Sequence, residues 1–227
     1  MIGDKLQQVQ ARIVTACTAA GRDPASVRLL AVSKTFPAEA LRAAHAAGQR
    51  AFGENYVQEG LEKAAELRAL GLQWHFIGPL QSNKTRVVAE TFDWVHSIDR
   101  LKIAERLSEQ RPGSLPPLHV CLQVNVSGED SKSGVALDEV PSLARQVAAL
   151  PRLQLRGLMA IPAPADDLAQ QREPFRRLRE AYERLKSDGL PLDTLSMGMT
   201  HDLEAAIAEG ATLVRVGTAI FGERSKS

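Results

Sequence analysis

The sequence predicts an α/β protein, a single (β/α)8 barrel of the TIM type with an extra N-terminal helix. Apolar runs rich in β-branched residues alternate eight times with segments of helical period, all within 227 residues. This alternation indicates parallel strands with right-handed crossovers, and eight such units fit a closed barrel near the lower limit of its usual size. An open doubly wound sheet is the alternative, but the GxGxxG fingerprint after its first strand is absent.

The elements are predicted in order along the chain. An amphipathic helix comes first, and its apolar side chains at helical spacing are Ile2, Leu6, Val9, Ile13 and Cys17. Strands are expected at 27–34, 50–55, 72–78, 94–99, 118–126, 153–161, 194–198 and 212–217. Helices are expected at 37–48, 56–70, 82–92, 100–110, 137–150, 172–189, 202–210 and 218–223. No linker rich in Pro, Gly or Ser divides the chain, so residues 1–227 are expected to form one domain with a frayed tail at 223–227.

Composition and charge are those of an ordinary soluble protein. Hydrophobic residues make up 44%, charged residues 24%, and the formal net charge is +1. No global field therefore attracts the chain to nucleic acid or membrane, and no apolar stretch approaches the ~20 residues of a membrane span. Cys17 and Cys121 form no CxxC motif, which indicates reduced thiols in the core. We expect a cytoplasmic protein without a nucleic-acid or membrane partner.

Polar residues end several of the predicted strands, at the rim where such barrels carry their sites. The strand ends include Lys34, Asn55, Ser196, Gly198, Arg215 and Gly217. Gly198 and Thr200 precede one helix, and Gly217 and Thr218 precede another. Free N–H groups at a helix start bind phosphate well, and barrels often hold phosphate after strands seven and eight. The alternative is that Thr200 is only an N-cap and that the glycines only serve turns.

Lys34 is the candidate nucleophile. A lysine at a strand end, in a semi-apolar cup, loses solvation of its charged form, so its pKa falls and the amine becomes reactive. A phosphorylated aldehyde anchored across the mouth could form a Schiff base with it, and pyridoxal 5′-phosphate is the common cofactor that carries both groups. The alternative is a lysine that extends into solvent.

Arg215 is expected to lie near Lys34, because the first and eighth strands are neighbours in a closed barrel. A guanidinium donates hydrogen bonds and accepts none, so beside the pyridine nitrogen it would keep that nitrogen unprotonated. The cofactor ring would then be a weak electron sink. The alternative for Arg215 is a structural ion pair with a residue such as Glu54.

Seven motifs together resemble those of the pyridoxal phosphate homeostasis proteins, also called the YggS-type or proline synthetase co-transcribed family. They are AVSKTFP, FGENYVQE, WHFIGPLQSNK, VNVSGEDSKSG, RGLMAIP, LSMGMTHDLEAAI and VRVGTAIFG, and the resemblance runs from about residue 5 to 223. It implies a barrel like the N-terminal domain of alanine racemase, with pyridoxal phosphate held on Lys34. The cofactor-binding residues that it implies are Lys34, Asn55, Ser196, Gly198, Thr200, Arg215, Gly217 and Thr218. The family usually has Ser where this chain has Thr200, and both residues keep a hydroxyl.

The resemblance implies a non-catalytic protein, expected to be a monomer, that serves vitamin B6 and amino-acid homeostasis. Such a protein would buffer pyridoxal phosphate and deliver it to the apo forms of enzymes that depend on it. The alternative is a weak amino-acid racemase. Racemases of this type need a second base opposite the lysine, usually a tyrosine, and this chain has only Tyr56 and Tyr182.

Three further hypotheses concern other residues. Lys84 and Lys132 lie on predicted rim loops and could contact phosphate or accept the cofactor transiently. A metal-dependent hydrolase is disfavoured because the five histidines form no HxH or HExxH pair. Nucleic-acid binding by the charged helix at 172–189 is disfavoured because its charges have mixed sign and the chain is only 4% aromatic.

Overall fold

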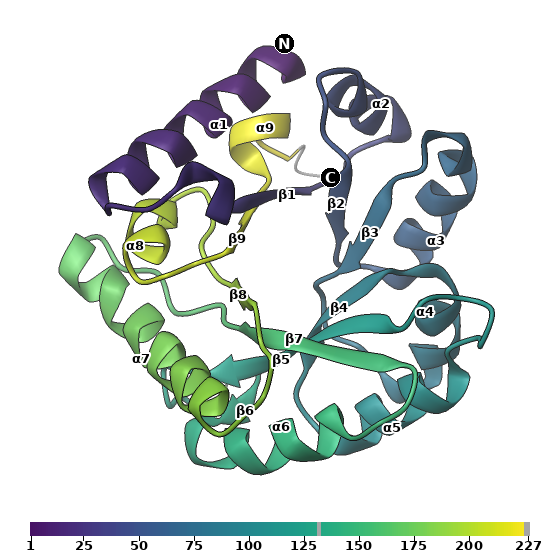
Figure 1. Ribbon diagram of the computed structural model, residues 1–227. Helices are drawn as coiled ribbons and strands as arrows, with labels where there is room; N and C mark the ends of the chain where they lie inside the picture. Colours follow the sequence, from purple (N-terminus) through teal and green to yellow (C-terminus); the bar gives the residue numbers. More distant parts are fainter. Residues whose placement is uncertain (131–132, 225–227) are drawn as a thin grey trace.

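The computed structural model describes residues 1–130 and 133–224. Within them, parallel strands form a closed ring surrounded by helices (Figure 1). The strands are β1 (Arg28–Val32), β2 (Ala51–Glu54), β3 (Gln73–Phe76), β4 (Trp94–Ile98), β5 (Leu118–Asn125), β6 (Val135–Ala136), β7 (Leu153–Met159), β8 (Thr194–Ser196) and β9 (Leu213–Val216). The order is β4-β3-β2-β1-β9-β8-β7-β5-β6, and pairing of β4 with β5 closes the ring. The predicted (β/α)8 barrel is confirmed.

Helices cover the outside of the ring. They are α1 (Ile2–Ala19), α2 (Ala38–Ala46), α3 (Val57–Glu66), α4 (Thr85–Thr91), α5 (Leu101–Gln110), α6 (Val140–Ala148), α7 (Leu168–Ser187), α8 (Leu203–Ala208) and α9 (Thr218–Phe221). The extra helix α1 packs beside α8 and α9, as Figure 1 shows. It buries Leu6, Val9, Ile13, Ala16 and Cys17. No helix in the described part of the chain is long and apolar enough to cross a membrane.

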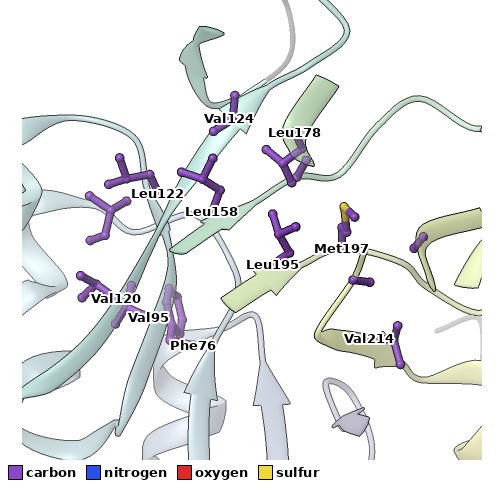
Figure 2. Close-up of a cluster of buried hydrophobic side chains, with 14 of the residues drawn as sticks. Phe76, Val95, Val120, Leu122, Val124, Leu158, Leu178, Leu195, Met197 and Val214 are labelled. Atoms are coloured by element: carbon purple, nitrogen blue, oxygen red, sulfur yellow. The ribbon is translucent and has the colours of Figure 1, made fainter. Parts of the chain in front are cut away.

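The main core lies between the ring and its helices. Alternate residues of each strand point outward, so side chains from β3, β4, β5, β7, β8 and β9 join Leu178 of α7 in the cluster of Figure 2. Burying one such side chain contributes about 1.5–3 kcal/mol relative to leaving it exposed. Smaller apolar clusters fill the ring, one around Leu30 and Leu213 and one around Trp94 and Cys121.

Two features differ from the predicted elements. The short strand β6 pairs with the end of β5 after a polar loop, where only a loop was expected. Helix α7 begins at Leu168 rather than at residue 172, because the Asp167 carboxylate accepts a hydrogen bond from the Ala169 N–H at 3.1 Å and caps the helix. Strands β7 and β8 lie so close together at position 157 that only glycine fits there. A Cβ on Gly157 would lie 1.6 Å from the Thr194 carbonyl oxygen of β8.

Candidate functional site

The carboxyl ends of the strands meet at one mouth of the barrel, and Lys34 follows the end of β1. Strand β1 pairs with β9, with Leu30 opposite Arg215, so closure of the ring places Lys34 and Arg215 on adjacent strands. The Lys34 side chain is half-buried. Burial lowers the pKa of its amine, and the positive charges of Arg224 and Arg215 lower that pKa further. A lowered pKa increases the neutral fraction of the amine, which is the nucleophilic form.

The main chain on both sides of Lys34 is held by side chains. Thr35 adopts a left-handed φ of 70°, which is uncommon for a residue other than glycine. Its N–H donates to Glu59 Oε1 at 2.5 Å. On the other side, the Ser33 hydroxyl donates to Glu54 Oε1 at 2.8 Å. Both carboxylates therefore bind residues that flank the lysine.

Lys63 of α3 joins these two carboxylates. Its buried ammonium lies 2.7 Å from Glu54 Oε1 and 2.7 Å from Glu59 Oε1, and it also donates to the Ser33 carbonyl at 2.8 Å. Because Glu54 is fully buried, this ammonium supplies the charge that its carboxylate needs. Sequence reasoning missed Lys63. The available signal was its position on the buried face of a helix, three residues after Gly60.

Arg215 lies in the barrel interior, where it is 3% exposed. Its Nη1 donates to Ser196 Oγ at 2.7 Å and its Nη2 donates to the Ala160 carbonyl at 2.9 Å. Burial lowers the pKa of the guanidinium to about 10, so it keeps its charge at neutral pH. The ion pair with Glu54 considered as an alternative does not form, because the Glu54 carboxylate pairs with Lys63 and accepts a hydrogen bond from Ser33.

The two predicted phosphate loops lie together. The Thr218 hydroxyl donates to Thr200 Oγ1 at 3.3 Å, so the start of α9 meets the turn before α8. Gly198 has a φ of +100°, and a Cβ there would lie 2.6 Å from the Ala206 Cβ, so the turn requires glycine. A Cβ on Gly217 would approach the Val32 carbonyl oxygen to 3.2 Å, which shows how closely this loop passes the end of β1.

Two side chains near these loops, Ser196 and Asp202, already have hydrogen-bond partners within the protein. The sequence predicts Ser196 around the phosphate, and in the structure its buried hydroxyl is engaged by Arg215 and by His96. Its contact with phosphate stays a prediction. Asp202 Oδ1 accepts a hydrogen bond from the Met199 N–H at 2.7 Å, so that N–H already has an acidic partner before α8 begins.

Asn55 follows β2 and lines a cavity of about 510 Å³ at the mouth. Ile77, Ser97, Asp99, Gln123 and Ile161 also line this cavity. Asn55 Oδ1 and Ser97 Oγ are buried and have no hydrogen-bond partner among the described residues. A buried polar atom without a partner costs free energy unless a ligand or water satisfies it. This part of the mouth therefore suits a polar ligand.

The other lysines and tyrosines of interest lie in different surroundings. Lys84 is exposed in the 3-10 turn Ser82–Lys84 after β3, and Lys132 lies outside the described residues. Tyr56 is 54% exposed, directly after Asn55. Tyr182 is buried on α7, where its hydroxyl donates to the Leu192 carbonyl at 3.2 Å and burial raises its pKa to about 12. Tyr182 is thus a structural residue outside the ring.

Two histidines are buried inside the ring. His75 and His96 are fully buried, and their rings hydrogen-bond to each other at 2.8 Å. Burial is the main reason why the pKa of each lies well below 6.5; the neighbouring His96 then lowers that of His75, and Arg215 lowers that of His96. Among the described residues, no three His, Cys, Asp or Glu side chains are placed to hold a metal ion.

These histidines predict a loss of stability in acid. Below pH 6.5 they gain protons in the unfolded chain but stay neutral in the folded one, so the free energy of unfolding falls with pH by about 1.4 kcal/mol per unit for each histidine. The slope continues down to the lowered folded-state pKa. Urea unfolding of His96→Asn between pH 6.5 and 5 should show a slope smaller by about 1.4 kcal/mol per unit. Equal slopes in His96→Asn and wild-type protein would contradict the expectation.

Fold and site together define a (β/α)8 barrel with a half-buried lysine and a buried arginine at adjacent strand ends. The comparisons with known proteins agree with this fold. The family described as alanine racemase, N-terminal domain, matches residues 5–225. The chain belongs to this family. An alanine racemase of Corynebacterium glutamicum shares the fold at 18% identity, with a TM-score of 0.69, and the chain covers 62% of that protein.

Within this family, curated relatives carry a more particular name. A protein of Pseudomonas aeruginosa is 66% identical over 98% of this chain and 96% of its own length, and one of Escherichia coli K12 is 58% identical over 100% and 98%. Both are named pyridoxal phosphate homeostasis protein, which confirms the resemblance that the motifs indicate. PipY of Synechococcus elongatus, solved with pyridoxal phosphate bound, is 40% identical over 98% of this chain and 100% of that chain, with a TM-score of 0.86.

Proposed function

We propose that this protein binds pyridoxal phosphate as a Schiff base on Lys34 and serves pyridoxal phosphate and amino-acid homeostasis without catalysing a reaction. The observation that carries the proposal is the half-buried Lys34 amine, whose pKa is lowered by burial and by Arg224 and Arg215. The amine nitrogen would bond to the aldehyde carbon, and the aldehyde oxygen would leave as water. The relatives' names and the cofactor in PipY support this choice of ligand.

The groups around the mouth fit the cofactor. Arg215 would donate a hydrogen bond to the pyridine nitrogen and keep it unprotonated, because a guanidinium has no acceptor. The buried Asn55 Oδ1, which lacks a partner among the described residues, would lie near the ring. The phosphate would be surrounded by Ser196, Gly198, Thr200, Gly217 and Thr218. Thr200 and Thr218 bring two hydroxyls within 3.3 Å of each other, and hydrogen bonds to a charged phosphate are stronger than those between neutral groups.

The same residues support a binding role over a catalytic one. The bound cofactor would act as an electron sink, but an unprotonated pyridine nitrogen beside Arg215 makes that sink weak. A racemase also needs a base on the face of the substrate opposite Lys34. Tyr182 is committed to the Leu192 carbonyl, which leaves the exposed Tyr56 beside Asn55 as the tyrosine of a weak racemase, the second candidate function. We propose that the protein is a cytoplasmic monomer that supplies apo enzymes.

The test is a visible-absorbance titration of the purified protein with pyridoxal phosphate, and with pyridoxal as the control that lacks the phosphate. We expect saturation at one equivalent for pyridoxal phosphate and binding weaker by about tenfold or more for pyridoxal, because one charged hydrogen bond contributes about 1.5–3 kcal/mol. Racemase assays with a panel of amino acids should show no turnover. No spectral change with pyridoxal phosphate would refute the proposed ligand, and rapid turnover lost in Tyr56→Phe would establish the racemase instead.

A further inference from the structure

A continuous line of polar side chains crosses the interior of the barrel below Arg215. Arg215 Nη1 lies 2.7 Å from Ser196 Oγ, and Ser196 Oγ lies 2.8 Å from His96 Nδ1. His96 Nε2 lies 2.8 Å from His75 Nδ1, and His75 Nε2 lies 2.8 Å from Gln73 Oε1. Strands β9, β8, β4 and β3 contribute these five residues. Most side chains inside barrels of this type are branched and apolar, so the line is a departure that needs a reason.

The direction of the hydrogen bonds follows from the donors and acceptors. Arg215 can only donate, so Ser196 Oγ accepts a hydrogen bond from it and donates its own O–H to His96 Nδ1. His96 then carries its proton on Nε2 and donates to His75 Nδ1. His75 in turn carries its proton on Nε2 and donates to Gln73. The reverse direction would make Ser196 accept twice and leave its proton without an acceptor in this line.

Burial prevents these groups from exchanging their partners with water. His75, His96 and Ser196 are fully buried. The indole of Trp94 stacks on His75, with ring centroids 5.1 Å apart and planes 11° apart. A polar atom that lost its partner here would stay unsatisfied, which costs far more than the same loss at a surface. These hydrogen bonds therefore hold the five side chains in one arrangement, and Arg215 lies at the end of the line nearest the mouth of the barrel.

We propose that His96 is a positioning residue for Arg215. By accepting a hydrogen bond from the Ser196 hydroxyl, His96 fixes the direction of the Ser196 lone pair to which Arg215 Nη1 donates, and this contact holds the guanidinium toward the cofactor's pyridine nitrogen. This inference rests on the proposed function, which gives Arg215 that contact. Ser196 and the Ala160 carbonyl hold two N–H groups of Arg215, so the direction of the remaining donors depends on both. Without an acceptor at His96, the Ser196 hydroxyl would rotate and the guanidinium would lose one of these two restraints.

The first test compares three variants in the pyridoxal phosphate titration. His96→Phe removes the acceptor, His96→Asn keeps an acceptor near the position of Nδ1, and His119→Phe is the matched control. His119 packs against the same Trp94, with ring centroids 4.9 Å apart, but its Nδ1 hydrogen-bonds to Arg156 and not to Arg215 or Ser196. We expect affinity to fall about tenfold in His96→Phe, as for the loss of one hydrogen bond to a charged group. The absorbance maximum should shift as well. His96→Asn should recover most of both effects, and His119→Phe should stay within about twofold of wild type.

The second test uses the wild-type protein, so its result does not depend on whether the variants fold. Nitrogen-15 NMR of histidine-labelled wild-type protein should show His75 and His96 as neutral rings protonated on Nε2. Addition of pyridoxal phosphate should shift the His96 nitrogens and leave those of His119 unchanged. Rings protonated on Nδ1, or a His96 signal indifferent to the cofactor, would overturn the inference, as would equal binding by His96→Phe and His119→Phe. If wild-type protein binds no cofactor, the proposed function fails. The NMR spectra of the free protein still show which ring nitrogens carry the protons, and so test the direction of the hydrogen bonds along the line.

Discussion

The Lys34→Ala variant is expected to lose pyridoxal phosphate on gel filtration under conditions in which the wild-type protein retains it. The substitution removes the amine whose pKa burial, Arg224 and Arg215 lower, and with it the covalent link to the aldehyde. Only the contacts to the ring and the phosphate would remain. We expect the apparent affinity to fall by about a hundredfold or more, which corresponds to about 3 kcal/mol. Visible absorbance of the protein peak measures the retained cofactor.

A lysine on the same rim provides the control for this experiment. Lys84 is exposed after β3, so Lys84→Ala should retain the cofactor as the wild-type protein does. Circular dichroism should show that Lys34→Ala is folded, since the Lys34 side chain is only half-buried. Undiminished retention by Lys34→Ala, or loss of the cofactor in Lys84→Ala alone, would exclude Lys34 as the point of attachment.

Lys63→Met should be among the most destabilising single substitutions in the chain. The Lys63 ammonium lies 2.7 Å from the carboxylate of Glu54, which is fully buried, and its removal leaves that charge without a cation. Removal of one partner of a buried ion pair costs about 3–5 kcal/mol. In a chain of this size we expect the melting temperature to fall by about 10 °C. Thr35 would also lose order, because Glu59 holds its N–H, so the reactivity of Lys34 toward aldehydes should fall too.

Two further variants show whether the lost stability comes from the unpaired Glu54 charge or from replacing a lysine with methionine as such. Lys63→Met combined with Glu54→Gln removes both charges, and part of the lost stability should return. Lys102→Met replaces an exposed lysine of α5 and should change the free energy of unfolding by less than about 0.5 kcal/mol. Urea unfolding measures all of these proteins. A Lys63→Met protein as stable as Lys102→Met would show that the ion pair contributes little.

Much of the fold could be predicted because it depends on local patterns. Apolar strands alternating with amphipathic helices have few topological solutions, and a closed ring makes the first and last strands neighbours. The pairing of Leu30 with Arg215 confirms that adjacency. Lys34 and Arg215 could be singled out because a charged residue at the end of a buried strand is unusual. The start of α7 and the strand β6 were missed because a single cap and a two-residue pairing leave little pattern in the sequence.

The internal polar contacts could not be predicted, because they depend on register around the ring. His96 and Ser196 are 100 residues apart and meet only because β4 and β8 face each other across the barrel interior. A histidine inside an apolar strand has the same local pattern whether or not another strand offers it a partner. The same holds for Lys63, whose ammonium reaches Glu54 only after α3 has packed against β2.

The central claim is most directly tested by mapping the attachment site in wild-type protein. The protein is mixed with one equivalent of pyridoxal phosphate, reduced with borohydride, digested, and analysed by peptide mass spectrometry. The account predicts a single major adduct on the peptide that contains Lys34. An adduct located mainly on Lys84, Lys132 or any other lysine, or no adduct at all, would contradict it.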